Sequence, residues 1–135
     1  MEQDKIKDID SVISVWINSS DENFDTMIDL YNSGRYSWSM FIGHLCIEKL
    51  LKAYFIKVEH THCLNLHNLL RISELAKLEL TKEQKDDFAM ITTFNIKARY
   101  DDYKQSFYKK CTKEFTDKWI DKIKSYRQWI KELLK

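Results

Sequence analysis

Apolar residues recur at helical spacing along most of the chain. Between residues 5 and 31 they stand three, four and eight positions apart, at Trp16, Phe24, Met27, Ile28 and Tyr31. This spacing places them on one face of a helix. From Thr112, a suitable N-cap, to Leu133 apolar residues again follow at intervals of three and four. The pattern predicts long amphipathic helices at both ends of the chain.

The stretch from residue 36 to 58 is apolar on nearly every side. A helix of this kind is buried, either at the centre of a bundle or between a bundle and a partner. Gly43 stands inside it, where the missing side chain allows a neighbouring helix to pack closely. A single polar stripe interrupts the apolar surface, at His44, Glu48 and Lys52, whose i, i+4, i+8 spacing places them on one face.

Polar residues predict the C-terminal end of the first helix and a possible break within it. Asn32-Ser33-Gly34 predicts its C-terminal cap, with Gly34 in the left-handed conformation. Residues 18–23 are also polar. They either interrupt the helix, with Ser19 and Glu22 as a capping box, or form the outer face of one unbroken helix.

The sequence predicts shorter elements in the middle of the chain. Thr81, with Gln84 three residues later, forms a capping box that predicts the start of a fourth helix. The remaining segments are a loop at 59–66, a short third helix at 67–78, the fourth helix up to about residue 98 and an irregular segment at 99–111.

The composition supports an all-α fold. The 135 residues include no proline and two glycines, so the chain has few of the residues on which tight turns depend. Gly34 and Gly43 are too far apart for a glycine-rich phosphate loop. The length fits one domain, residues 1–135. We expect an up-and-down four-helix bundle with an additional short helix.

Charge is unevenly distributed, although the net charge is only +1. Residues 1–33 carry eight acidic residues and two lysines, whereas residues 97–135 carry twelve basic and six acidic residues. A basic C-terminal third attracts phosphate backbones. The simpler interpretation, which we favour, is that an acidic first helix lies beside a basic last helix and the two neutralise each other.

Cellular location follows from three features. The N-terminus, Met1-Glu2-Gln3-Asp4, is acidic, where a secretory leader would be basic. Apolar runs are too short to span a membrane. Three widely spaced cysteines, Cys46, Cys63 and Cys111, are typical of free thiols. We therefore expect a cytoplasmic protein with no membrane partner.

The polar stripe at His44, Glu48 and Lys52 is the first candidate for chemistry. Burying a charge without a partner is costly, so these side chains are not there for packing alone. Two interpretations remain equally open: a buried structural network, or a polar seam that lines a cleft.

The segment Arg99-Tyr100-Asp101-Asp102 is the second candidate. Arginine binds phosphate with two parallel hydrogen bonds. The aromatic residues of this region alternate with lysines, a combination suited to stacking on bases beside a phosphate track; they are Tyr100, Tyr103, Phe107 and Tyr108, with Lys97, Lys104, Lys109 and Lys110. Taken alone, a loop pinned to the bundle by its aromatic side chains explains the segment better.

His60, His62 and Cys63, with His67 nearby, are residue types that ligate zinc. Their spacing fits no standard zinc finger, and no second cysteine pair exists. We therefore expect no metal and no cofactor, and a metal site at His60, His62 and Cys63 is the less favoured alternative.

Several motifs resemble the HEPN domain family. The family's first two helices contain a tryptophan, an apolar ladder, a G-x-Y turn, an aromatic residue and then E-K-x-L-K-A. Here the corresponding residues run without a gap from Trp16 through Gly34-Arg35-Tyr36 to Glu48-Lys49-Leu50-Leu51-Lys52-Ala53. His67-Asn68-Leu69 resembles the family's H-x-L segment, and Arg99-Tyr100-Asp101 its R-Y-P-D signature. The ungapped match favours an unbroken first helix.

The resemblance implies an all-α bundle that often forms a homodimer. It also implies a link to a minimal nucleotidyltransferase, because family members are commonly encoded beside one as a toxin–antitoxin pair. Many members are metal-independent RNases, whose signature is an arginine and a later histidine separated by four to six residues. Here that interval after Arg99 holds Lys104, Gln105 and Ser106, and no histidine follows His67. Lysine is a poor general base at neutral pH.

Our leading hypothesis is a non-catalytic HEPN module. It binds a nucleotide, RNA or a nucleotidyltransferase partner through a cleft between the second and fourth helices. Arg99 would bind phosphate and Tyr100 would stack or brace, while the supporting residues would be Asp101, His44, Glu48, Lys52 and His67. The alternatives are an RNase toxin with a rearranged site, in which Arg99 acts with Lys104 or a partner-chain residue, and a purely structural dimerisation domain.

Overall fold

The computed structural model describes residues 5–135, and the acidic residues 1–4 lie outside it. Six helices account for most of the described chain: α1 (Ile9–Asn32), α2 (Tyr36–Glu59), α3 (Leu69–Leu75), α4 (Lys82–Lys97), α5 (Asp101–Lys110) and α6 (Lys113–Leu133). The predicted all-α class is confirmed. No helix among the described residues is long and apolar enough to cross a membrane.

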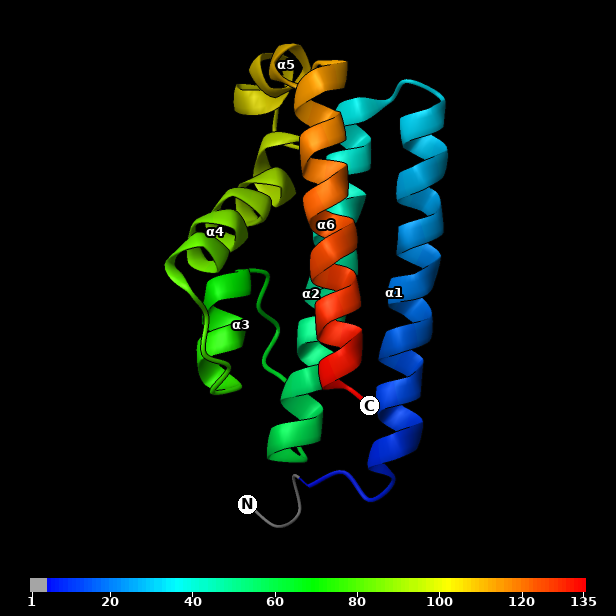
Figure 1. Cartoon of the computed structure of the whole chain (residues 1–135), viewed down its shortest axis with the longest axis vertical. Coiled ribbons are helices and arrows are strands. Elements are labelled where there is room, and N and C mark those ends of the chain that lie inside the picture. Colours follow the sequence, from blue (N-terminus) through cyan, green and yellow to red (C-terminus); the bar gives the residue numbers. More distant parts are fainter. Residues whose placement is uncertain (1–4) are drawn as a thin grey trace.

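The four longer helices alternate in direction, as an up-and-down bundle requires (Figure 1). α1 and α6 flank α2, while α4 crosses obliquely and α3 and α5 lie beside it. α2 packs against α1, α3, α4, α5 and α6. This central place explains why α2 is apolar on nearly all sides. The predicted bundle is confirmed, with α3 as the additional short helix.

α1 is one unbroken helix, so the possible break at residues 18–23 does not occur. Ser20 is buried there, and its hydroxyl donates to the carbonyl oxygen of Cys46 on α2 at 2.8 Å. Lys49 donates to the Ser19 hydroxyl at 2.6 Å. The helix begins at Ile9 rather than at residue 5, because the Asp8 side chain caps its first turn.

The two glycines occupy the positions that the sequence predicts. Gly34 has φ +79°, a left-handed conformation that ends α1. Gly43 lies where α2 meets both α1 and α6. A Cβ there would stand 2.7 Å from Ile123 Cδ1 and 2.9 Å from Met27 Sδ. The predicted close packing at Gly43 is therefore confirmed.

The later helices confirm some boundaries and correct others. The Thr81–Gln84 capping box forms, and Thr112 caps α6 by accepting from the Phe115 N–H. α3 is shorter than predicted, because Asn68 caps its start and Ala76 ends it.

The expectation of an irregular segment at 99–111 is wrong, since α5 occupies most of it. α5 carries acidic residues in its first turn and lysines in its last, which suits the helix dipole.

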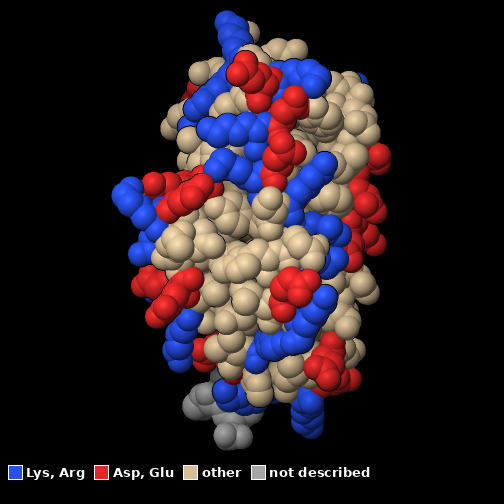
Figure 2. Space-filling view, in the orientation of Figure 1, with Lys and Arg blue, Asp and Glu red and all other residues tan. Residues whose placement is uncertain are grey.

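The acidic first helix and the basic last helix do make contact. Asp21 on α1 pairs with Arg127 and Lys131 on α6, at 3.0 and 2.8 Å. Elsewhere the charges stay apart. In Figure 2, acidic residues line the edge formed by α1, while basic residues, mixed with some acidic ones, gather at the end that holds α5 and the start of α6. The expected neutralisation is therefore local to Asp21.

Candidate functional site

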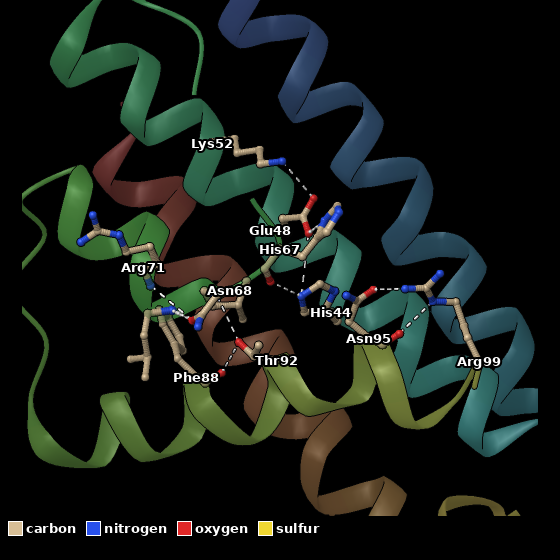
Figure 3. Close-up of polar contacts among 12 residues, drawn as sticks. His44, Glu48, Lys52, His67, Asn68, Arg71, Phe88, Thr92, Asn95 and Arg99 are labelled. Carbon is tan, nitrogen blue, oxygen red and sulfur yellow. Dashed lines mark hydrogen bonds and ion pairs between the residues drawn. The ribbon is translucent and has the colours of Figure 1, made fainter. Parts of the chain in front are cut away.

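Glu48 lies at the centre of a buried polar cluster on α2 (Figure 3). Its carboxylate accepts a hydrogen bond from His67 Nδ1 at 2.8 Å and from Lys52 Nζ at 3.3 Å. His44 Nε2 stands 3.8 Å from the same carboxylate. The predicted polar stripe of α2 is thus one connected group, and His67 joins it from the segment before α3.

His44 is completely buried within this cluster. Burial is the main cause that lowers its pKa, and the nearby charge of Arg99 acts in the same direction, while the hydrogen bond to the His67 backbone and the charge of Glu48 oppose them. The ring is therefore neutral near neutral pH. Its Nε2–H donates to the His67 carbonyl oxygen at 2.8 Å, which leaves Nδ1 as a buried acceptor without a partner among the described residues.

His67 connects the buried cluster to the surface. Its side chain is 52% exposed, although Nδ1 is held by the buried Glu48. Asn68 follows as the N-cap of α3, and the next N–H, of Leu69, donates to the Thr92 hydroxyl on α4 at 3.0 Å. Backbone contacts to α3 and α4 therefore fix the position of the His67 ring.

Arg99 is exposed but held in one orientation. Nε donates to the Asn95 carbonyl oxygen at 2.8 Å, and Nη2 donates to the Asn95 side-chain oxygen at 3.2 Å. The guanidinium lies over the rings of Phe41 and Tyr100, 5.2 Å from each ring centre. Figure 3 shows Asn95 between His44 and Arg99, so the arginine continues the polar row on the solvent side.

The structure brings together most of the predicted site residues. His44, Glu48, Lys52 and His67 are in contact, and Arg99 lies next to them. Tyr100 is the N-cap of α5 and is half exposed, with its ring against Arg99. Asp101 does not join this group.

Asp101 instead lines a hollow of about 640 Å³ between the α1–α2 turn and α5. This hollow is not the expected cleft between the second and fourth helices. It lies between the α1–α2 turn and α5, whereas α2 and α4 pack directly on each other. Trp38 lines the hollow, and its ring meets that of Phe41, over which Arg99 lies, edge to face at 6.0 Å.

Sequence reasoning missed three residues that shape this region: Asn95, Phe41 as a platform for Arg99, and Ser37 in the hollow. Asn95 lies in the last turn of α4, four residues before Arg99, which follows the C-cap Ala98; this spacing brings side chains together while the chain stays close to helical. The roles of Phe41 and Ser37 depend on the packing of α2 against α4 and α5, and no local pattern signals them.

The residues considered as zinc ligands do not converge. Within residues 5–135 no group of three His, Cys, Asp or Glu side chains lies close enough together to hold a metal ion. His60 ends α2 in the left-handed conformation, with φ 61°. Cys63 is a free, half-buried thiol, and burial raises its pKa.

Comparison with known proteins gives one match. A family model described as HEPN domain matches residues 13–133, which is most of the chain. No curated protein and no solved structure matches significantly. The matched range includes every candidate residue described above.

Proposed function

Because this chain belongs to the HEPN domain family, we propose that it binds a nucleotide or single-stranded RNA without cleaving it. Membership of the family suggests a nucleotide- or RNA-related function. The binding surface that we propose, called the Arg99 surface below, consists of Phe41, Trp38, Arg99, Tyr100 and Lys104.

The state of Arg99 is the observation that carries this proposal. The described carboxylates pair with Arg71 and Arg127 but none pairs with Arg99. Asn95 and two aromatic rings hold the guanidinium, yet its Nη1 end has no hydrogen-bond partner among the described residues. An exposed, oriented and unpaired guanidinium is suited to bind a phosphate group with two hydrogen bonds.

The neighbouring residues suit a nucleic acid. Trp38 is 36% exposed and Tyr100 is 53% exposed, so both offer ring surface to a base. Lys104 lies 5.4 Å from the centre of the Trp38 ring and adds a second positive charge. Aromatic rings alternating with cations bind single strands with little dependence on sequence.

Replacement of Arg99 by alanine tests the proposal. Binding of a labelled single-stranded RNA of about ten nucleotides, measured by fluorescence anisotropy, should weaken about tenfold or more, because a charge-assisted hydrogen bond is lost. Parallel titrations with AMP and ATP measure whether the protein also binds a free nucleotide. Arg71→Ala is the matched control, since Arg71 is also exposed but pairs with Glu74 at 2.9 Å.

Two results would contradict the proposal. If the wild type and Arg99→Ala bound the RNA equally well, Arg99 would not be part of the binding site. Loss of the helical circular dichroism signal in Arg99→Ala would make the residue structural.

RNA cleavage is the second candidate function, and the position of the His67 side chain is the observation that favours it. A half-exposed imidazole whose Nδ1–H donates to a buried carboxylate leaves Nε2 available for proton transfer. Incubation of the purified protein with total RNA, with and without a chelator, distinguishes the two functions. If cleavage persists with the chelator and disappears in both Arg99→Ala and His67→Ala, the protein is an RNase and the proposal of binding without cleavage is wrong.

A partner remains a separate prediction. A homodimer and a complex with a minimal nucleotidyltransferase are both expected from the family resemblance. Exposed aromatic residues on α5, Tyr103 and Tyr108, provide surface for such contacts, being 51% and 68% exposed. Light scattering of the protein alone, and then mixed with the product of a neighbouring nucleotidyltransferase gene, measures both associations.

A further inference from the structure

The hollow between the α1–α2 turn and α5 adjoins the Arg99 surface. We call it the α2 pocket; its volume is about 640 Å³, within the range of small-molecule sites. Its lining includes Arg35, Ser37 and Trp38 from the start of α2, and Asp101, Lys104 and Tyr108 from α5. Trp38 and Lys104 belong to both regions, so the pocket and the Arg99 surface form one continuous surface.

The first turn of α2 presents free N–H groups to this pocket. The backbone N–H groups of Tyr36, Ser37 and Trp38 have no acceptor among the described residues, because no side chain caps the helix. Among the six helices of residues 5–135, α2 is the one with neither a side-chain cap nor an acidic residue in its first turn. Free N–H groups and the positive end of the helix dipole attract anions.

Ser37 supplies independent evidence for a ligand. The residue is 9% exposed and lines the pocket. Its hydroxyl is open to the pocket and makes no hydrogen bond with any described residue, so it is free to donate to a ligand there. A phosphate oxygen in the pocket would accept from this hydroxyl and from the N–H groups beside it.

The charges of the pocket also favour an anion. Arg35 and Lys104 are cationic, and Asp101 is the one carboxylate in the lining. Asp101 stands in the first turn of α5, where the dipole of that helix stabilises its charge. Arg35, in contrast, is the N-cap of α2, where a cation is unfavourable unless an anion neutralises it.

We propose that the α2 pocket binds a phosphate monoester that carries an aromatic base. The phosphate lies at the N-terminus of α2, between Arg35, Lys104 and the Ser37 hydroxyl, and the base lies against the exposed rings of Trp38 and Tyr108. The ligand is either a free nucleoside monophosphate or the 5′-phosphate end of an RNA strand. This assignment rests on the proposed function, since it names the group of the ligand that the domain recognises.

Four probes separate phosphate, base and strand: AMP, adenosine, and one short RNA with either a 5′-phosphate or a 5′-hydroxyl. Binding is measured by calorimetry with the full chain. We expect AMP to bind at least about tenfold more tightly than adenosine, because the phosphate accepts charge-assisted hydrogen bonds. The RNA with a 5′-phosphate should show the same advantage over the 5′-hydroxyl RNA if a strand end is the ligand.

Variants locate the site. Arg35→Gln and Ser37→Ala should weaken AMP binding, by about tenfold and several-fold respectively. Asp101→Asn should tighten it, because a repelling carboxylate is removed from the pocket. Lys85→Gln is the matched control, since Lys85 is an exposed lysine in a different hollow, between α3 and α4. The circular dichroism of each variant establishes that the fold is intact.

The outcomes distinguish the pocket from the proposed function. Equal binding of AMP and adenosine, or an equal effect of Lys85→Gln and Arg35→Gln, would overturn the pocket assignment. Tight binding of both RNAs without any 5′-phosphate preference and without AMP binding would also overturn it, while leaving the Arg99 surface intact. AMP binding that depends on Arg35, without RNA binding, would support the pocket and restrict its ligand to the mononucleotide.

Discussion

Glu48 is the residue on which the buried cluster of α2 depends. The residue is 4% exposed, and its carboxylate pairs with Lys52 and accepts a hydrogen bond from His67. Lys52 is itself 5% exposed and lies 5.7 Å from the centre of the Trp16 ring. The Lys52 ammonium group is therefore largely shielded from water. If the Glu48 carboxylate were removed, little water could take its place.

Glu48→Ala should lower the free energy of unfolding by about 3 kcal/mol, because removal of one member strands the other charge in the interior. Urea unfolding measures the change. Glu74→Ala, which breaks the exposed pair with Arg71, should change stability by less than about 1 kcal/mol. The double variant Glu48→Ala/Lys52→Met should recover part of the loss. A Glu48→Ala effect no larger than that of Glu74→Ala would show that the pair is solvated.

His44 makes a second prediction at the residue scale. Its pKa is lowered in the folded protein, chiefly by burial, from an ordinary value of about 6.5. Below that value the unfolded chain binds a proton that the folded chain rejects, so stability should fall as the pH drops from about 7 towards the folded pKa.

His44→Gln keeps a donor for the His67 carbonyl and removes the titration. The loss of unfolding free energy between about pH 7.5 and pH 5 should therefore be smaller in this variant than in the wild type. Urea unfolding at both pH values gives the comparison. The other three histidines are present in both proteins, so the comparison isolates the contribution of residue 44. An identical loss in the two proteins would mean that another group causes it.

At the scale of elements, α5 has one buried side chain that packs into the bundle. Phe107 is 3% exposed, the single buried residue of this helix, and its ring lies 5.5 Å from that of Phe94 on α4. The other residues of α5 are exposed. Since α5 forms one wall of the α2 pocket, the packing of Phe107 also positions the proposed ligand site.

Phe107→Ala should destabilise α5 by about 3 kcal/mol, the usual cost of emptying a buried aromatic position. In this variant hydrogen exchange should become much faster in residues 101–110, whereas α2 should stay protected by its packing against α1, α4 and α6. Tyr108→Ala is the matched control, because the neighbouring tyrosine is 68% exposed. Equal exchange in both variants would show that Phe107 does not anchor the helix.

The same helix shows where prediction from sequence stops. The boundaries at Gly34, Thr81 and Thr112 could be predicted, because caps are local chemistry that a few residues determine. α5 could not, because one buried residue in ten gives no helical period to detect. Its formation depends on long-range packing of Phe107 against Phe94.

The candidate site divides in the same way. Spacing on α2 predicted that His44, Glu48 and Lys52 share a face. The aromatic residues and lysines around Arg99 made that segment a candidate, and the resemblance added His67 to the site. The platform for Arg99 and the pocket beside Ser37 could not be predicted, since they form between elements that are far apart in sequence. Only the arrangement of α2, α4 and α5 in space reveals them.

At the scale of the whole molecule, charge should determine how RNA approaches. The first 33 residues hold eight acidic residues, whereas the basic residues of the last 39 include those on α5 and α6. Figure 2 shows the two kinds of charge on different parts of the surface. A negatively charged strand is therefore attracted to the end that holds α5 and repelled along α1.

The salt dependence of RNA binding tests this approach. Each phosphate neutralised on a single strand contributes about −0.7 to the slope of log K against log salt, so contacts to Arg99, Lys104 and Arg35 predict a slope near −2. Arg99→Ala should reduce its magnitude by about 0.7, and Lys85→Gln, in the hollow between α3 and α4, should leave it unchanged. Anisotropy titrations at four salt concentrations measure each slope. A slope near zero would show that stacking alone binds the strand, and an equal reduction by Lys85→Gln would show that charge anywhere on the molecule suffices.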